Sequence, residues 1–303
     1  MNNLIDINEL IKLVWNLKVK ILSLSALFSI LSIFYALSLV EVYTVKATLL
    51  PSDSETETSL SKTNMSKGFS LPSLAGISIG GNGASVETNI ALERLGSWAF
   101  IDDFIRSNNL ESSILAIKDW DESNDVIYYY DDIGYDSVKD NWDNPEFINS
   151  KQVRWQLYKD FKNNLNISFS KSSGLINIHY THESPEIAYQ IILKLISDIN
   201  IEMKNRKLKI LDENIRNLEE YTSSLQEAAL VQRLYDILAE QMSLRVIASG
   251  DNEFAFLIVA EPMIPFERTS PRRAFVVIAL SFVGFIFSIM FFLVTSFFKK
   301  RTF

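Results

Sequence analysis

Cysteine is absent from this 303-residue chain, and histidine occurs only twice, as His179 and His182. Without cysteine the chain has no disulfide, no thiolate metal ligand and no cysteine nucleophile. Two histidines leave little material for a zinc site or for acid–base catalysis by imidazole. Neither has carboxylates beside it at metal-ligand spacing, so we expect both to be surface residues. We expect no metal site, no cofactor and no catalytic residue.

Basic residues are too few to offset the acidic ones. Lys and Arg number 29 against 37 Asp and Glu, which gives a net charge of -8 and a pI near 5.0. Such a chain binds polyanions poorly, which excludes nucleic acid as a partner. Its mean hydropathy is nevertheless +0.09, a high value for a protein with 22% charged residues. The apolar residues are therefore concentrated rather than spread.

Two blocks, residues 21–40 and 274–298, contain no charged side chain. Each is long enough to cross a bilayer as a helix. A cleaved signal peptide is the alternative for the first block, but this block is longer than a usual signal core and no small-x-small cleavage site ends it. We therefore expect two transmembrane helices and exclude a purely soluble protein.

The basic residues around the blocks predict the orientation. Three lysines lie before the first block, and two lysines and an arginine follow the second. The positive-inside rule places residues 1–20 and 299–303 in the cytoplasm, because these six basic residues outnumber Arg272 and Arg273 on the other side of the membrane. Residues 41–273 then form a domain in a bacterial periplasm, anchored in the inner membrane. The two cytoplasmic segments are too short for a kinase or any other catalytic domain.

Period-2 and period-3.6 patterns divide the outer domain into strands and helices. Residues 41–50 alternate, with Val45, Ala47 and Leu49 on one face, which predicts a half-buried strand. Residues 51–85 are rich in Ser, Thr, Gly and Asn and predict a mobile loop, whose glycines lack the Lys and Ser/Thr of a phosphate-binding loop. Residues 87–108 predict one helix with a broad apolar face.

The segment 118–145 is acidic and aromatic. Four of its side chains have the spacing that opens a calcium loop: Asp119, Asp121, Ser123 and Asp125. However, Asn124 replaces the glycine that the sharp turn of such a loop needs, and Tyr130 replaces the bidentate glutamate. A solvated acidic loop is the better interpretation. Its aromatic side chains could contact sugar, although packing within the protein is the simpler role.

A hairpin over residues 165–180 precedes a long helical region. Ser184, Pro185 and Glu186 form a helix start, with a capping serine, a proline at the first position and an acid in the first turn. After Pro185, the rest of the region 185–249 contains neither Gly nor Pro. A single helix of that length would span about 96 Å, and the chain must still return to the second block, so we expect a helical hairpin with its turn at 221–224.

Apolar residues follow a heptad-like stripe along this region, with polar interruptions: Leu208, Leu211, Ile215, Leu218, Thr222, Leu225, Ala229 and Gln232. The stripe fits packing within the chain and contacts between subunits equally well. The apolar run 254–260 predicts a strand buried between two neighbours. We expect an α+β membrane protein: two transmembrane helices flank a periplasmic domain with a small mixed sheet near the membrane and a long helical hairpin extending from it.

The residues around the second block carry a spaced motif. It reads Pro-x2-Pro-x4-Ser-Pro-Arg-x11-Gly-x3-Ser, over Pro262, Pro265, Ser270, Pro271, Arg272, Gly284 and Ser288. The prolines hold the chain extended and form a stiff connector. Gly284 and Ser288 form a small-xxx-small face, against which the first helix, another subunit or another membrane protein could pack closely.

This motif resembles the signature of the polysaccharide co-polymerases, the Wzz-type chain-length determinants, with Ser288 where the family usually has a second glycine. The resemblance implies a non-enzymatic regulator that forms a ring-shaped homo-oligomer. It also implies that this ring sets the modal length of O-antigen or a related glycan, made by a membrane polymerase from lipid-linked repeats. A role in capsule or exopolysaccharide export remains open. A two-span sensor is less favoured, since it would need a cytoplasmic output module.

Overall fold

The computed structural model describes residues 15, 17–52, 86–121, 124, 126–130, 134–139 and 141–301. Most of the N-terminal segment 1–20 and nearly all of the loop predicted over 51–85 lie outside these residues. The chain forms two compact units. One comprises Met1–Val42 with Glu267–Phe303, and the other is Tyr43–Phe266.

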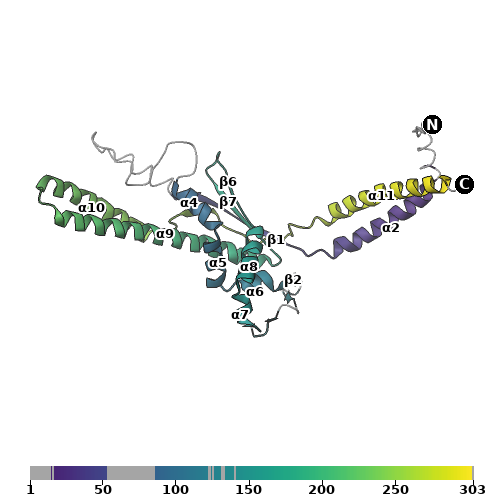
Figure 1. The fold of residues 1–303 in the computed structure, drawn as a ribbon, viewed down its shortest axis with the longest axis horizontal. Helices are drawn as coiled ribbons and strands as arrows, with labels where there is room; N and C mark the ends of the chain where they lie inside the picture. Colours follow the sequence, from purple (N-terminus) through teal and green to yellow (C-terminus); the bar gives the residue numbers. More distant parts are fainter. Residues whose placement is uncertain are drawn as a thin grey trace. The chain divides into compact units, whose positions relative to one another are not determined.

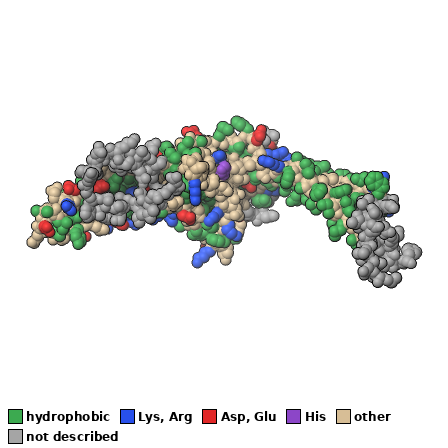
Figure 2. Space-filling view, turned by 90° about the horizontal axis from the view of Figure 1, so that it is seen from above, with side chains coloured by type: hydrophobic (Ala, Val, Ile, Leu, Met, Phe, Trp, Pro, Cys, Tyr) green, Lys and Arg blue, Asp and Glu red, His purple; other side chains and the backbone are tan. Residues whose placement is uncertain are grey.

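The first unit is a pair of apolar helices, α2 (Lys18–Leu37) and α11 (Arg273–Arg301), which pack along each other (Figure 1). The segments Lys18–Leu37 and Arg273–Thr295 are long and apolar enough to cross a membrane. Most of their large apolar side chains are exposed, as they are on helices that face lipid, and Figure 2 shows them covering the surface of this pair. Both helices predicted from the sequence are present, and each begins slightly earlier than predicted.

A four-stranded sheet organises the second unit, in the order β6-β7-β1-β8. Its strands are β1 (Tyr43–Pro51), β6 (Leu165–Phe169), β7 (Ile176–His182) and β8 (Phe256–Ala260). The α+β class is confirmed, but every strand pair is antiparallel, so the prediction of a mixed sheet is wrong. The predicted hairpin is present, and its turn closes through Gly174, whose φ of +70° is the left-handed conformation that glycine adopts without strain.

The predicted alternation in β1 is confirmed. Val45, Ala47 and Leu49 are fully buried and lie opposite buried residues of β7. By contrast, β8 is an edge strand that pairs with β1 and has exposed residues at its end, so the prediction of a strand between two neighbours is wrong. A continuous apolar run does not distinguish an edge strand that a helix covers from a central strand.

Helices cover the sheet and complete the core. The helix predicted over 87–108 is two helices, α4 (Val86–Leu95) and α5 (Trp98–Ser107), because the Ser97 side chain accepts a hydrogen bond from the Phe100 N–H and starts a new helix. Helix α8 (Lys151–Asn164) packs against α5, where Arg154 pairs with the buried Asp102.

A long helical hairpin extends from the core (Figure 1). It consists of α9 (Pro185–Ser224) and α10 (Ala228–Gly250), and Ser184 caps α9 as predicted. The chain turns directly after the predicted turn at 221–224. Leu211, Ile215 and Thr222 of the heptad-like stripe are buried in the α9–α10 pair, whereas Ala229 and Gln232 are exposed. Packing within the chain therefore accounts for the part of the stripe on α9.

The segment 118–145 is exposed, as predicted, but it is not an irregular loop, which corrects the prediction. It contains two short hairpins, β2 (Ile117–Asp121) with β3 (Val126–Tyr129) and β4 (Tyr135–Asp136) with β5 (Asn141–Trp142). The small helices α6 (Glu111–Leu115) and α7 (Pro145–Ile148) flank them. Its aromatic rings pack together, with centroids 5.3 Å apart for Tyr129 and Tyr135 and 5.0 Å apart for Tyr135 and Trp142. These ring contacts and the two hairpins give the segment regular local structure, while all of its described residues remain at least partly exposed.

Asn200 of α9 attaches β8 to the helix. Its buried side chain donates to the Phe256 carbonyl at 3.0 Å and accepts from the Ala255 and Phe256 N–H groups, both at 2.8 Å. These backbone groups lie on the side of β8 that has no strand partner. One amide side chain therefore replaces a missing strand.

We expect Asn200→Ala to lower the free energy of unfolding by about 2–3 kcal/mol, because it leaves buried backbone groups without partners. The exposed Asn217 of the same helix gives a matched control, and Asn217→Ala should change stability by less than about 0.5 kcal/mol. Urea unfolding of the detergent-solubilised chain, followed by tryptophan fluorescence, measures both. Equal stability of the two variants would contradict the role of Asn200.

Candidate functional site

The residues of the spaced motif divide between the two units. Pro262 and Pro265 follow β8 in the second unit, in a segment without helix or strand. Pro262 is buried and Pro265 is half-buried. Because proline has no N–H to donate, this segment does not continue the strand ladder of β8. The other five motif residues, from Ser270 to Ser288, belong to the helix-pair unit.

Backbone hydrogen bonds join the two chain segments at the ends of the helices. The Val42 N–H donates to the Ser270 carbonyl at 2.9 Å, and the Thr269 N–H donates to the Val42 carbonyl at 2.9 Å. Ser270 is thus held by its backbone, while its side chain is exposed. The segment that leaves α2 and the segment that enters α11 are held side by side.

An ion-pair cluster reinforces this junction. The Glu41 carboxylate accepts from Arg273 at 2.9 Å and also pairs with Arg268. Arg272, the basic residue of the motif, is exposed and makes no ion pair with the part of the chain that the structure describes. Sequence reasoning missed Glu41 and Arg273 as partners. The available signal was their position, since they flank the two apolar blocks and are opposite in charge.

Gly284 allows the two helices to approach closely. A Cβ atom at this position would lie 2.5 Å from the Cβ of Phe28 and 2.8 Å from its Cγ, which is closer than real contacts allow. The Oγ atoms of Ser32 and Ser281 are 3.3 Å apart at the same interface, and the Phe28 and Phe287 rings meet edge to face. Of the neighbours expected for this face, the first helix is the one that Gly284 contacts in this chain.

Ser288 fits where the related motif has glycine. Its side chain is fully buried, and its hydroxyl donates to the Gly284 carbonyl of the same helix at 2.8 Å. The hydroxyl is therefore satisfied within its own helix and does not disturb the helix pair.

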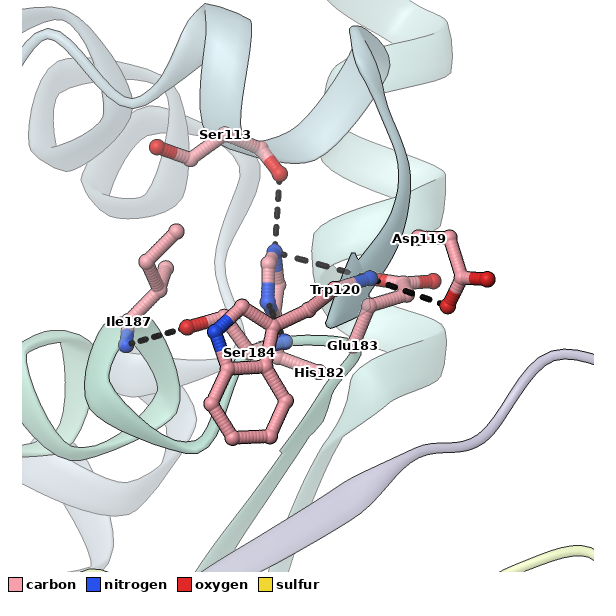
Figure 3. Close-up of polar contacts among 7 residues, drawn as sticks. All are labelled: Ser113, Asp119, Trp120, His182, Glu183, Ser184 and Ile187. Atoms are coloured by element: carbon pink, nitrogen blue, oxygen red, sulfur yellow. Dashed lines mark hydrogen bonds and ion pairs between the residues drawn. The ribbon is translucent and has the colours of Figure 1, made fainter. Parts of the chain in front are cut away.

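His182 is buried, so the prediction that it is a surface residue is wrong (Figure 3). Its Nδ1 accepts from the Ser184 N–H at 2.9 Å, which assigns the proton to Nε2, and Nε2 donates to the Ser113 carbonyl at 2.8 Å. The Glu183 carboxylate lies 3.6 Å from Nε2. The imidazole joins α6 to the start of α9. Since both nitrogens are engaged in hydrogen bonds, replacing His182 should cost stability, as replacing a surface histidine would not.

His179 lies on the other face of β7, as predicted, opposite Lys46 of β1. Partial burial and the nearby Lys46 charge lower its pKa. Tyr180, between the two histidines, is fully buried, and burial raises the pKa of its phenol. A neutral imidazole and a neutral phenol at these positions are structural groups of a strand.

Among the described residues, no group of three or more His, Asp or Glu side chains could hold a metal ion. Ser123 and Asp125 of the calcium-like spacing lie outside those residues. The motif residues and their neighbours form a mechanical arrangement: two helices in close contact, an ion-pair cluster at their ends and a proline segment next to the edge strand.

We expect Gly284→Leu to separate α2 from α11, because no side chain fits against Phe28. The chain has no cysteine, so a Ser32→Cys, Ser281→Cys pair reports this contact without background. Oxidation should cross-link the two cysteines, and Gly284→Leu should abolish the cross-link. Circular dichroism should show that the second unit, Tyr43–Phe266, stays folded.

The matched control is Ser288→Gly, which should keep the cross-link because it removes only a hydrogen bond within α11. Gly284→Ala should weaken the cross-link, because the new methyl group would lie 2.5 Å from the Phe28 Cβ. A cross-link that survives Gly284→Leu would refute the close contact.

Comparison with known proteins bears on the family. Residues 3–88 match the family model described as Wzz, chain length determinant protein. No curated protein sequence matches the chain. Among solved structures, a full-length bacterial polysaccharide co-polymerase is similar, with 12% identity over 98% of this chain and 99% of that chain and a TM-score of 0.41. A fragment of WzzB, a polysaccharide co-polymerase from Salmonella Typhimurium, is 13% identical over 76% of this chain and 100% of that chain, with a TM-score of 0.31.

The matched stretch includes the first apolar helix and β1 but not the proline motif, which was read independently from the other end of the chain. The two agree. The match of residues 3–88 confirms the resemblance to the Wzz-type family that was stated from the sequence.

Proposed function

We propose that this chain is a non-enzymatic regulator of the length of a bacterial surface polysaccharide, of the O-antigen type, acting beside a membrane polymerase that uses lipid-linked repeats. The observation that carries this proposal is the match of residues 3–88 to the chain length determinant family. The structure supports a mechanical role, because its motif residues form helix contacts and a connector rather than a reactive site.

The proposed orientation puts both termini in the cytoplasm and Tyr43–Phe266 in the periplasm of an inner-membrane protein. The basic residues at the cytoplasmic ends and the two apolar helices support it. An alkaline phosphatase fused at Asn141 should be active, and an inactive fusion would reverse the orientation.

A second apolar stripe on α10 supports assembly into a closed homo-oligomer. Tyr235, Ala239, Met242 and Val246 recur at helical spacing and are exposed, while Leu238 and Ala248 of the same helix are buried in the hairpin. The stripe therefore faces away from α9. We propose that it contacts a neighbouring copy, in place of the heptad-like stripe, whose α9 residues pack within the chain.

We expect Met242→Glu with Val246→Glu to reduce the oligomer to smaller species, because two charges would be buried in the contact. Arg233→Glu, which changes an exposed residue of α10 outside the stripe, should leave the assembly intact. Mass photometry in nanodiscs measures both. A monomeric wild-type chain at micromolar concentration, or an unchanged mass for the double variant, would sink the assembly proposal.

Deleting the gene should leave polymer synthesis running while the length distribution loses its mode, because a regulator changes when chains end and not whether bonds form. The glycan ladder on a gel, from deletion and complemented cells, measures this. Gly284→Leu, and Pro262→Ala with Pro265→Ala, should shift the mode, whereas His179→Ala should not.

Loss of all polymer would instead indicate an enzyme or an export component. An unchanged ladder would contradict the proposed function. If the altered polymer is found in capsule or exopolysaccharide and not on lipopolysaccharide, the regulator acts on that glycan class.

A further inference from the structure

An aromatic cluster on α5 and α8 is open to solvent. Trp98, Trp155 and Tyr158 are in mutual contact, with ring centroids 5.2–5.3 Å apart. Trp98 is 37% exposed and Trp155 is 51% exposed. Contact among these rings leaves much of their apolar surface exposed. Clusters of exposed aromatic side chains of this kind mark interaction sites. We call these three side chains the aromatic platform.

The platform is held rigid. The Tyr158 hydroxyl donates to the Gly96 carbonyl at 3.1 Å, and Lys162 donates to that hydroxyl at 3.0 Å and to the same carbonyl at 3.3 Å. Beneath it, Arg154 of α8 donates to the buried Asp102 of α5 at 2.7 Å. Because the rings are already fixed, a ligand that stacks on them loses little further conformational entropy.

Positive charge surrounds the platform although the chain as a whole is acidic. Lys151, Lys159 and Lys162 are exposed on α8 at helical spacing around Trp155 and Tyr158, over about 16 Å of helix. Within the described ranges none of the three forms an ion pair. The single carboxylate of α8, Asp160, accepts from Gln156. The face thus alternates cations with aromatic rings.

We infer that this face binds an acidic segment of the growing glycan, a proposal that rests on the proposed function. The C–H face of a pyranose ring carries partial positive charge and packs on the negative face of an aromatic ring. A carboxylate on such a sugar would form ion pairs with these lysines. The length of the lysine row fits an oligosaccharide rather than a single sugar.

A second copy of this chain fits the face less well. A contact through the same face would bring the lysines of two copies together, which is repulsive. A stable protein contact also buries about 800 Å² on each partner, more than three partly exposed rings provide.

The test uses the full chain in nanodiscs and oligosaccharides released by mild acid from the surface polysaccharide of the cells that encode it, separated by charge. Isothermal titration calorimetry should show binding of the acidic fraction. Trp155→Ala should weaken it by about tenfold, the scale of one stacked ring, and Trp155→Phe should retain most of it. Lys159→Gln with Lys162→Gln should weaken it and flatten its salt dependence. Tyr221→Ala, which removes an exposed aromatic side chain on α9, should have no effect.

The inference is overturned if no fraction binds, if Trp155→Ala binds like the wild type, or if neutral and acidic fractions bind equally. It is also overturned if Trp155→Ala changes the oligomer mass and not the binding, which would make the face an interface between copies. These outcomes leave the proposed function standing as long as the gene deletion still removes the mode of the glycan ladder. An unchanged ladder with intact binding would instead contradict the proposed function alone.

Discussion

The absence of a side chain at Gly284 sets the distance between the two apolar helices. With Phe28 lying against the bare backbone, Ser32 reaches Ser281 and Phe28 reaches Phe287. In lipid such contacts must come from close packing, because burying apolar surface brings no gain there. The clamp of Glu41 with Arg268 and Arg273 then holds the helix ends at one level. A charge pair beyond the apolar spans is compatible with a membrane, whereas one within them would be costly.

Local patterns predicted much of the fold. The capping serine and proline that start α9, the alternation of β1 and the glycine turn between β6 and β7 are all decided by residues within a few positions of one another. The break at Ser97 was also local, but an apolar face that continues across it concealed the cap. The edge position of β8 could not be predicted, because it depends on Asn200, more than fifty residues away in the chain.

For the site residues too, local features were predicted and contacts between distant segments were not. Gly284 was identified from its spacing in the motif, and a side chain close to it was expected, although Phe28 as its partner was not. His182 was misplaced because β7 was taken to end at Tyr180; two further residues of strand put His182 on the buried face with Tyr180 and leave His179 on the other. Trp98 and Trp155 belong to different helices, so only the packing of α5 on α8 reveals that their rings meet.

The single amide of Asn200 has a mechanical consequence. About 36 Å of α9 extend beyond it to Ser224, whereas β8 lies directly at its side chain. The hairpin is therefore a lever whose fulcrum is the sheet. A sideways force on the tip of the hairpin would reach the edge strand as a larger force over a smaller displacement. The three hydrogen bonds of Asn200 connect the helix to the edge strand, a few residues before Pro262 and Pro265, which lead out of the domain.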